Sequence, residues 1–372
     1  MKFLVVTYAP LIKEDNKVYS YAPYVNEINI WEQNVTEIAF CCPTWKTSKG
    51  LLKKEITFNI FRHYETIDFN TKGILRKLIA IFPALFNCIQ VFRSIYWADH
   101  IHLRCPGNMG LLGCMIQVFF PGKIKTAKYA GNWDSSSKQP PSYKLQRWIL
   151  NNTFLTRNMQ VLVYGNWPDS TKNILPFFTA TYKESDRIVT SQRDFHGPIK
   201  LIFVGSLTLG KQPLISCMVA KQLTEKGITV SLDIYGEGPE RKEIEKFISA
   251  NQLEKNIHLH GNQIGEVVKA AYQQAHFLVF ISESEGWPKA VAEAMWWGCL
   301  PVTTAVSCVP EMVGYGERGD LVKPDPVEIV ARIQYYTNHP DEYKAKCTAA
   351  MDWSRHYTLE RFEKEIKELL HS

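Results

Sequence analysis

The sequence predicts an α/β protein built from two doubly wound domains, each a parallel sheet with helices on both faces. Three observations predict this class. The chain has 372 residues, enough for two domains of about 150 residues. Its 45% hydrophobic and 22% charged residues are typical of a folded globular protein. In the second half, short apolar runs alternate with amphipathic segments of about ten residues or more, which indicates βαβ units.

The second half has the clearer alternation. Its predicted strands are the apolar runs 200–205, 229–236, 256–261, 276–282, 300–304 and 319–322. The predicted helices between them are 213–227, 240–251, 266–275 and 288–297. After Pro324 only helices are expected, at 327–337, 341–354 and 359–370.

The first half repeats the pattern less regularly. Its predicted strands are 2–7, 37–41, 56–61, 99–104, 124–130 and 160–164. Its predicted helices are 19–31, 73–96, 109–119 and 143–152.

The polar stretch 184–198 is the predicted linker. We therefore expect a first domain over 1–190, a second over 199–350, and a C-terminal helix over 351–372 that could cross back onto the first domain. Two such domains would face a cleft, and ligands of doubly wound sheets bind at the carboxyl ends of the strands.

Charge is distributed unevenly along the chain. Residues 1–199 carry 24 Lys and Arg against 14 Asp and Glu, whereas residues 200–372 carry 19 against 23. The nine Cys form no C-x-x-C pair and lie mostly in apolar runs, as buried thiols in a reducing compartment do. The apolar start of the chain fits a buried strand better than a signal peptide, and the longest apolar stretch, 79–91, is too short to span a bilayer. We expect a cytoplasmic protein.

The richest segment chemically is 281–302, ISESEGWPKAVAEAMWWGCLPV. Gly286 permits a close backbone approach, and Pro288 suits the first turn of a helix. Glu285 precedes that helix and Glu293 lies inside it. The N-terminus of a helix favours a phosphate, and nearby carboxylates can accept hydrogen bonds from sugar hydroxyls. The alternative is that Glu285 caps the helix and Glu293 is solvated.

This segment resembles the E-x7-E signature of retaining glycosyltransferases of the family-four type, which have the GT-B fold. The match runs from Glu285 to Glu293 and continues through Ala294-Met295 to Pro301-Val302. Upstream, FVGSLTLGK at 203–211 resembles the F-V-G-R-L-x-x-x-K loop of the family, and YGEGP at 235–239 resembles its G-x-G-P loop. The resemblance covers residues 199–338.

The resemblance implies a donor site for a UDP- or GDP-linked sugar. Glu293 would hold the ribose, Glu285 would lie by the transferred sugar, and Lys211 would contact the diphosphate. The remaining donor-site residues that it implies are Gly205, Ser206, Gly236, Gly238, Asn262, Gln263, Gly286, Trp287 and Pro288. No further cofactor and no nucleic-acid partner is expected.

Several positions depart from the family pattern. Ser206 stands where the family usually has Arg, Ser307-Cys308 replace a glycine pair, and one extra residue precedes Pro301. No two Asp are spaced D-x-D, which argues against a metal-dependent transferase of the GT-A type, and no metal site is expected.

In the first domain, the loop KYAGNWDSSSKQP at 128–140 follows a predicted strand. Its Asn132, Trp133 and Asp134 offer an amide, an aromatic ring and a carboxylate that suit a carbohydrate, and Asp134 is a candidate catalytic residue. The alternative is an ordinary Asx turn beside a half-buried Trp.

The segment 72–97 combines an apolar face with Lys72, Arg76, Lys77 and Arg93. It is either a core helix with solvated basic residues or a peripheral contact with a membrane surface, such as the inner face.

The favoured hypothesis is a retaining glycosyltransferase that moves a sugar from a nucleotide diphosphate to a hydroxyl of a saccharide or lipid-linked acceptor in surface polysaccharide or glycolipid biosynthesis. One alternative is a non-catalytic GT-B partner or scaffold of another transferase, motivated by Ser206. Another is a two-domain sugar-binding protein of periplasmic type, against which the absence of a signal peptide counts.

Overall fold

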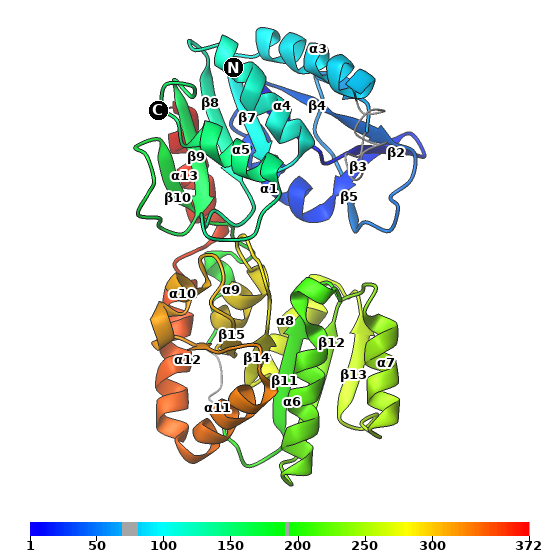
Figure 1. Cartoon of the computed structure of the whole chain (residues 1–372), viewed down its shortest axis with the longest axis vertical. Helices are drawn as coiled ribbons and strands as arrows, with labels where there is room; N and C mark the ends of the chain where they lie inside the picture. The colour runs from blue at the N-terminus through cyan, green and yellow to red at the C-terminus, as the bar shows by residue number, and fades with distance from the viewer. Residues whose placement is uncertain (69–80, 190–192, 372) are drawn as a thin grey trace. The chain divides into compact units, whose positions relative to one another are not determined.

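The computed structural model of the chain describes residues 1–68, 81–189 and 193–371 (Figure 1). The chain forms two compact units, one from Met1–Phe177 with Glu363–Ser372 and one from Phe178–Phe362. The first division falls ahead of the 184–198 segment that we expected as the linker. The second falls inside the last helix, whose final turns pack with the first unit.

The sheet of the first unit is parallel at its centre, in the order β10-β9-β8-β7-β1-β4. The parallel strands are β1 (Lys2–Val6), β4 (Glu37–Trp45), β6 (Arg62–Thr66), β7 (His100–Cys105), β8 (Ile124–Tyr129), β9 (Met159–Tyr164) and β10 (Ile174–Phe177). Beyond β4 the sheet continues with β2 (Leu11–Glu14), which pairs with β4 in parallel, and then with β3 (Lys17–Tyr21) and β5 (Lys53–Glu55), which are joined by antiparallel pairing. The sheet is therefore mixed.

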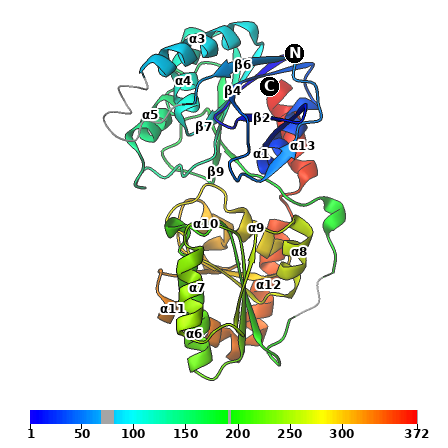
Figure 2. The same cartoon turned by 90° about the vertical axis from the view of Figure 1, so that its right-hand side faces the viewer.

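Helices cover both faces of this sheet because side chains of β1 alternate between two apolar layers. Leu4 and Val6 belong to the core on the side of α3 and α4, whereas Phe3 stacks on Trp31 of α1 with ring centroids 5.4 Å apart. Within its described residues, the α-helices of this unit are α1 (Ala22–Glu32), α3 (Ile81–Trp97), α4 (Asn108–Ile116), α5 (Pro141–Leu150) and the C-terminal part of α13 (Leu359–His371). In Figure 2, α13 lies on the same side of the sheet as α1.

Two expectations for the first unit are wrong. Residues 56–61 are not a strand: Ile56 is buried and the apolar residues alternate, but the ladders form on either side of the segment, in β5 and β6. The first helix begins at Ala22 rather than at residue 19, because Tyr19–Tyr21 pairs with β5. The first part of the helix predicted over 73–96, with Lys72, Arg76 and Lys77, lies outside the described residues.

The second unit contains a six-stranded, wholly parallel sheet in the order β13-β12-β11-β14-β15-β16. Its strands are β11 (Ile199–Val204), β12 (Val230–Tyr235), β13 (Ile257–Gly261), β14 (Phe277–Phe280), β15 (Leu300–Thr303) and β16 (Asp320–Leu321). All six match the apolar runs that predicted them. The chain moves outward from β11 through β12 to β13, then returns to β14 on the other side of β11. The topological switch point therefore lies between β11 and β14.

Two layers of helices enclose this sheet (Figures 1 and 2). One layer contains α6 (Pro213–Glu225), α7 (Arg241–Ala250) and α11 (Pro326–Asn338). The other contains α8 (Gly265–Gln274), α9 (Lys289–Trp296) and α12 (Pro340–Ser354). A short helix that the sequence analysis missed, α10 (Val309–Met312), follows β15. Among the described helices, none combines the length and apolarity needed to cross a membrane.

Candidate functional site

The loops after β11 and β14 lie at the switch point of the second sheet. This is the place where ligands of open α/β sheets bind. The β11 loop carries Gly205, Ser206 and Lys211, and the β14 loop carries Glu285 and Gly286. These predicted site residues come from segments separated by the whole of β12, β13 and their helices, and the fold brings them to one edge.

Backbone contacts fasten the two loops together. The Glu283 N–H donates to the carbonyl oxygen of Gly210 at 2.9 Å, and the Ser282 hydroxyl reaches the same oxygen at 3.3 Å. With the loops held in this way, the Lys211 ammonium pairs with Glu285 Oε1. The ammonium also lies over the Phe280 ring, 5.0 Å from its centroid. The Glu285 side chain is only 7% exposed and that of Lys211 24%, so the pair is positioned and partly shielded from water.

The glycines beside this pair serve close packing between loops. A Cβ atom on Gly236 would lie 1.9 Å from the carbonyl oxygen of Gly205, and one on Gly238 would lie 2.2 Å from that of Leu207. Hydrogen bonds join the same segments, from Gly205 N to Tyr235 O and from Leu207 N to Glu237 O, both at 3.0 Å. Glycine is therefore required at 236 and 238 by the fold itself, whatever the loops bind.

Ser206, Asn262 and Gln263 are exposed at this edge of the sheet. Gln263 Nε2 donates to the carbonyl oxygen of His260 at 2.8 Å, which orients its amide. Asn262 and Gln263 follow β13. The Gly236 N–H, just after β12, donates to the Gly261 carbonyl oxygen at 2.9 Å, so the loops after β12 and β13 are joined. With the loop after β11, they form a continuous rim.

The turn into α9 is supported by the segment that follows β15. The carbonyl oxygen of Gly286 accepts from the Ser307 hydroxyl and from the Cys308 thiol, each at 3.2 Å. Pro288 immediately precedes the first helical residue of α9. Ser307 and Cys308, which replace a glycine pair of the resembled family, thus hold the loop that carries Glu285.

Glu293 lies in different surroundings from Glu285. Its Oε1 accepts from the Thr181 hydroxyl at 2.8 Å. Burial raises the pKa of Glu293 above its usual value, against the effect of that hydrogen bond. The carboxylate in turn contributes, after burial, to the raised pKa of Tyr182. An ionised carboxylate is unfavourable in this buried position when no ligand is bound. Perturbed pKa values of this kind are typical of functional sites.

Trp287 packs in an aromatic cluster. Its ring stacks on Trp353 with centroids 6.2 Å apart and meets the edge of Tyr357 at 5.4 Å. Phe178 lies 6.5 Å away. These contacts account for the residue as an anchor of the β14–α9 turn, and its place in the donor site remains a prediction.

In the first unit, the loop that carries Asp134 is folded as an Asx turn. Asp134 Oδ1 accepts from the Ser136 N–H and from the Ser136 hydroxyl, both at 2.8 Å. Trp133 is 5% exposed and packs against Tyr129, with ring centroids 5.0 Å apart. Of the two alternatives for this loop, the structure shows the Asx turn, and the Trp133 ring is part of the core rather than an exposed surface for a sugar. The carboxylate of Asp134 is still partly exposed.

The sequence analysis missed a buried cluster of charges in the first unit. Glu27 of α1 pairs with Arg104 of β7 and with Lys128 of β8, the latter at 2.9 Å. Burial alone would raise the pKa of Glu27, but the charges of Arg104 and Lys128 outweigh it and hold that pKa well below its usual value. The sequence offered one signal for this cluster, the basic residues within the apolar runs HIHLRC and IKTAKY. It gave no sign of their common partner Glu27, which lies on a helix far away in the sequence.

Within residues 1–68, 81–189 and 193–371, no three His, Cys, Asp or Glu side chains are grouped so that they could hold a metal ion.

Comparison with known proteins adds to this geometry. Residues 185–351 match the family model described as glycosyl transferases group 1, a segment that contains all the donor-site residues predicted from the sequence. The chain is 31% identical over 140 residues to the putative colanic acid biosynthesis glycosyltransferase WcaL of Salmonella typhimurium, an alignment that covers 36% of this chain and 34% of that protein. It is 27% identical over 117 residues to the GDP-mannose:cellobiosyl-diphosphopolyprenol alpha-mannosyltransferase of Xanthomonas oryzae pv. oryzae, with 31% of each chain covered. The chain thus matches about a third of the length of these curated relatives.

Solved structures resemble the whole chain at low sequence identity. HepE of Anabaena, solved in complex with UDP and glucose, superposes with a TM-score of 0.68 at 13% identity and covers 100% of both chains. Sucrose-phosphate synthase of Thermosynechococcus elongatus gives 0.67 at 15% identity and covers 100% of this chain and 98% of its own. These likenesses show the fold, which is GT-B, as the sequence predicted.

Proposed function

We propose that the protein is a retaining glycosyltransferase of polysaccharide or glycolipid assembly, which transfers a sugar from a nucleotide-diphosphate donor to an acceptor hydroxyl. The observation that carries the proposal is the Lys211–Glu285 pair at the switch point of the second sheet. The group 1 match over residues 185–351 supports it, as do relatives named for colanic acid biosynthesis and for mannosyl transfer.

Lys211 would receive the donor diphosphate. A lysine ammonium is a compact charge with three donors, so it can bind a phosphate oxygen while it keeps its contact with Glu285. The N-terminus of α9, directly after Pro288, adds partial positive charge where the leaving diphosphate develops negative charge. No metal is needed in this arrangement.

Glu285 would orient the transferred sugar. Its carboxylate has two oxygens, and the ion pair with Lys211 uses Oε1. The other oxygen can accept from a sugar hydroxyl. Glu293 would likewise accept from the ribose, and Asn262 and Gln263 would lie near the base. Because Glu293 has a raised pKa, ribose hydroxyls would supply hydrogen bonds that its ionised form otherwise lacks.

Retention of configuration would follow from attack on the same face of the sugar. The bond between the anomeric carbon and the diphosphate oxygen breaks, and the acceptor oxygen bonds to that carbon from the same side. The hydroxyl proton passes to an oxygen of the leaving diphosphate. Asp134 of the first unit would act on the acceptor side, toward a saccharide or lipid-linked saccharide, through the carboxylate oxygen that its own turn leaves available.

The test is release of nucleoside diphosphate from a panel of UDP- and GDP-sugars, by wild type and by Glu285→Gln. We expect turnover of one donor by wild type and a loss of about 100-fold or more in the variant, typical of a lost electrostatic contact at a reacting centre. The anomeric configuration of the product, measured by NMR, tests retention. Failure of the wild type to transfer or hydrolyse any donor would contradict the proposal.

One observation favours a second candidate, a non-catalytic GT-B partner of another transferase. Ser206 stands exposed where the resembled family has a bidentate phosphate donor. Tight nucleotide binding without turnover, and restoration of turnover only by a second protein, would support this candidate.

A further inference from the structure

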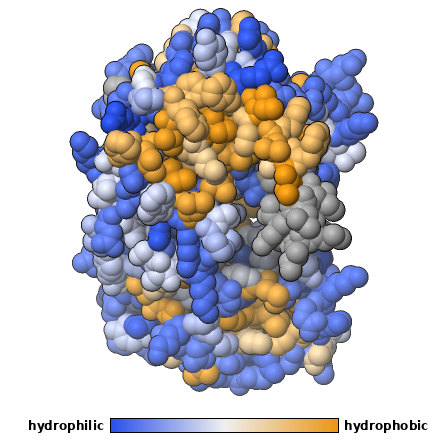
Figure 3. All heavy atoms as spheres, turned by 45° about the horizontal axis from the view of Figure 1, so that its top comes forward, coloured by the Kyte–Doolittle hydropathy of each residue, from blue (hydrophilic) through white to orange (hydrophobic). Residues whose placement is uncertain are grey.

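The first unit displays an apolar stripe along α3. Phe82, Leu85, Ile89, Phe92 and Tyr96 are spaced by three or four residues, so they share one side of the helix. Their exposed fractions run from 47% for Phe92 to 74% for Tyr96. Figure 3, which brings the α3 end of the molecule forward, shows apolar residues gathered there.

The stripe exists in addition to the face that α3 buries. Asn87, Val91, Ser94 and Ile95 pack inward, so the exposed stripe is not the side of α3 that meets the core. A helix that only covered a sheet would turn a polar face to water. Residues 81–97 contain no Asp or Glu and one basic residue, Arg93. This outward apolarity is therefore unexplained by the fold.

Next to α3 the apolar surface is hollowed. Phe92 and Arg93 of α3, with Ile116 and Phe119 of the following segment, line a hollow of about 380 Å³. Phe119 is 74% exposed. The apolar surface thus extends from α3 onto the end of the α4 segment.

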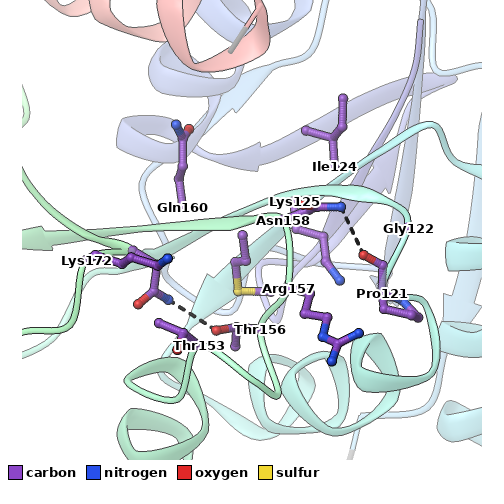
Figure 4. Close-up of a pocket in the computed structure, with 12 residues that line it drawn as sticks. Pro121, Gly122, Ile124, Lys125, Thr153, Thr156, Arg157, Asn158, Gln160 and Lys172 are labelled. Carbon is purple, nitrogen blue, oxygen red and sulfur yellow. Dashed lines mark hydrogen bonds between the residues drawn. The ribbon is translucent and has the colours of Figure 1, made fainter.

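A basic hollow of about 810 Å³, whose lining is shown in Figure 4, begins two residues after Phe119 in the chain. It is lined by Pro121, Gly122, Ile124, Lys125, Thr153, Thr156, Arg157, Asn158, Met159, Gln160, Lys172 and Asn173. None of these residues is acidic. Lys125 donates to the Phe120 carbonyl oxygen at 2.8 Å, and the side chains of Arg157 and Lys172 are exposed. A second hollow, which shares Thr153, adds Lys144 and Arg147.

The turn 119–125 joins the two surfaces. Phe119 lines the apolar hollow, and Lys125, six residues on, lines the basic one. Over residues 81–173, which include the lining of both hollows, the chain carries ten Lys and Arg against three acids, Asp99, Asp134 and Asp169. An apolar surface bordered by an acid-free basic hollow matches an amphiphile with an apolar tail and an anionic head.

We propose that this surface binds an anionic lipid bilayer, with the α3 stripe in the interfacial region and a lipid phosphate in the basic hollow. The charge decides against a second copy of the chain as the occupant. Two copies that met through the same face would bring two acid-free basic hollows together, and like charges oppose such a contact. The proposal does not depend on sugar transfer, so its test is separate from that of the proposed function.

The test is co-sedimentation of the full chain with vesicles of phosphatidylcholine alone, or of phosphatidylcholine with one quarter phosphatidylglycerol, at low and high salt. We expect binding to the anionic vesicles only, weakened by salt. Arg157→Ala with Lys172→Ala should lower the partition coefficient about 30-fold, from the loss of two charges near the surface. Lys242→Ala with Lys255→Ala, two exposed lysines of the second unit, is the matched control and should change little.

A second pair of variants tests the stripe. Phe82→Ser with Ile89→Ser should lower binding more than tenfold, whereas Val327→Ser, an exposed apolar residue of α11, should not. Because all these side chains are exposed, thermal unfolding should be unchanged. Equal binding to neutral vesicles, no binding at all, or equal effects of the paired variants and their controls would overturn the proposal. A concentration-dependent dimer abolished by Phe82→Ser would also overturn it.

Discussion

Lys211 and Glu285 form an ion pair across 74 residues of sequence, and the carboxylate is the more deeply buried partner. The ammonium side chain is 24% exposed against 7% for the carboxylate. Loss of the ion pair should therefore affect the two residues unequally. The Lys211 ammonium can turn toward water or toward a ligand, whereas the Glu285 carboxylate cannot.

This inequality predicts the order of two substitutions. Lys211→Ala leaves a buried carboxylate without its cation and should lower the free energy of unfolding by about 1–3 kcal/mol. Glu285→Ala should cost less, because Lys211 can reach solvent. Urea unfolding followed by tryptophan fluorescence measures both, with Lys242→Ala as control. A larger loss for Glu285→Ala would contradict this description of the pair.

The contact between Gly205 and Gly236 predicts a second effect. Gly236→Ala places a Cβ 1.9 Å from a backbone oxygen, at a φ of +142° that side chains rarely adopt. We expect a loss of about 2 kcal/mol or more in the free energy of unfolding. Gly265→Ala is the matched control, because nothing lies within 4 Å of its added Cβ and it begins α8. Equal stability of the two variants would refute the packing role of Gly236.

The raised pKa of Glu293 predicts a dependence on pH. Because the folded state holds the proton more tightly than the unfolded state, this contribution to stability is present below the ordinary pKa of 4.5 and is lost as the pH rises through the folded value. Glu293→Gln keeps an acceptor for Thr181 without the charge. Its melting temperature should equal that of wild type near pH 4 and exceed it at pH 8.

The same substitution should weaken nucleotide binding if Glu293 accepts from the ribose. A variant that gains stability and loses affinity is expected where an unfavourable group is kept for a ligand. A Glu293→Gln protein less stable than wild type at pH 8 would show that the charged form is favoured in the fold.

Two substitutions of Trp287 separate its role in packing from a contact with the ligand. Trp287→Ala should destabilise the second unit by about 3 kcal/mol, because it empties the space beside Trp353 and Tyr357. Trp287→Phe preserves most of this packing, and because Trp287 is a predicted donor-site residue we expect weaker nucleotide binding at an unchanged melting temperature. Nucleotide affinity equal to that of wild type in Trp287→Phe would contradict this and leave the residue a packing role alone.

The sequence was most informative where strands are buried on both faces. Such strands appear as continuous apolar runs, and all six of the second unit were found. In the first unit, the alternation over 56–61 predicted a strand that is not there, because alternation alone could not show whether a partner strand lies beside the segment. The β2–β3 hairpin was missed although Asp15 and Asn16, both at positive φ, are typical residues of its turn.

The site was predictable only as a set of loops. Resemblance located Lys211 and Glu285, but their mutual contact depends on the docking of two loops through backbone groups that carry no sequence signal. For the Glu27–Arg104–Lys128 cluster, the sequence showed only the two basic residues within apolar runs and not their acidic partner. Its members lie on α1, β7 and β8, and only the strand order brings them together.

Calorimetric titration of the wild type and Lys211→Ala with UDP, GDP and ADP tests the central claim most directly. The account predicts that one of these nucleotides binds the wild type at a single site, and that Lys211→Ala weakens it at least tenfold while the protein remains folded at the titration temperature. If no nucleotide binds the wild type, or if the variant binds it as tightly, the switch point of the second sheet is not a nucleotide-diphosphate site.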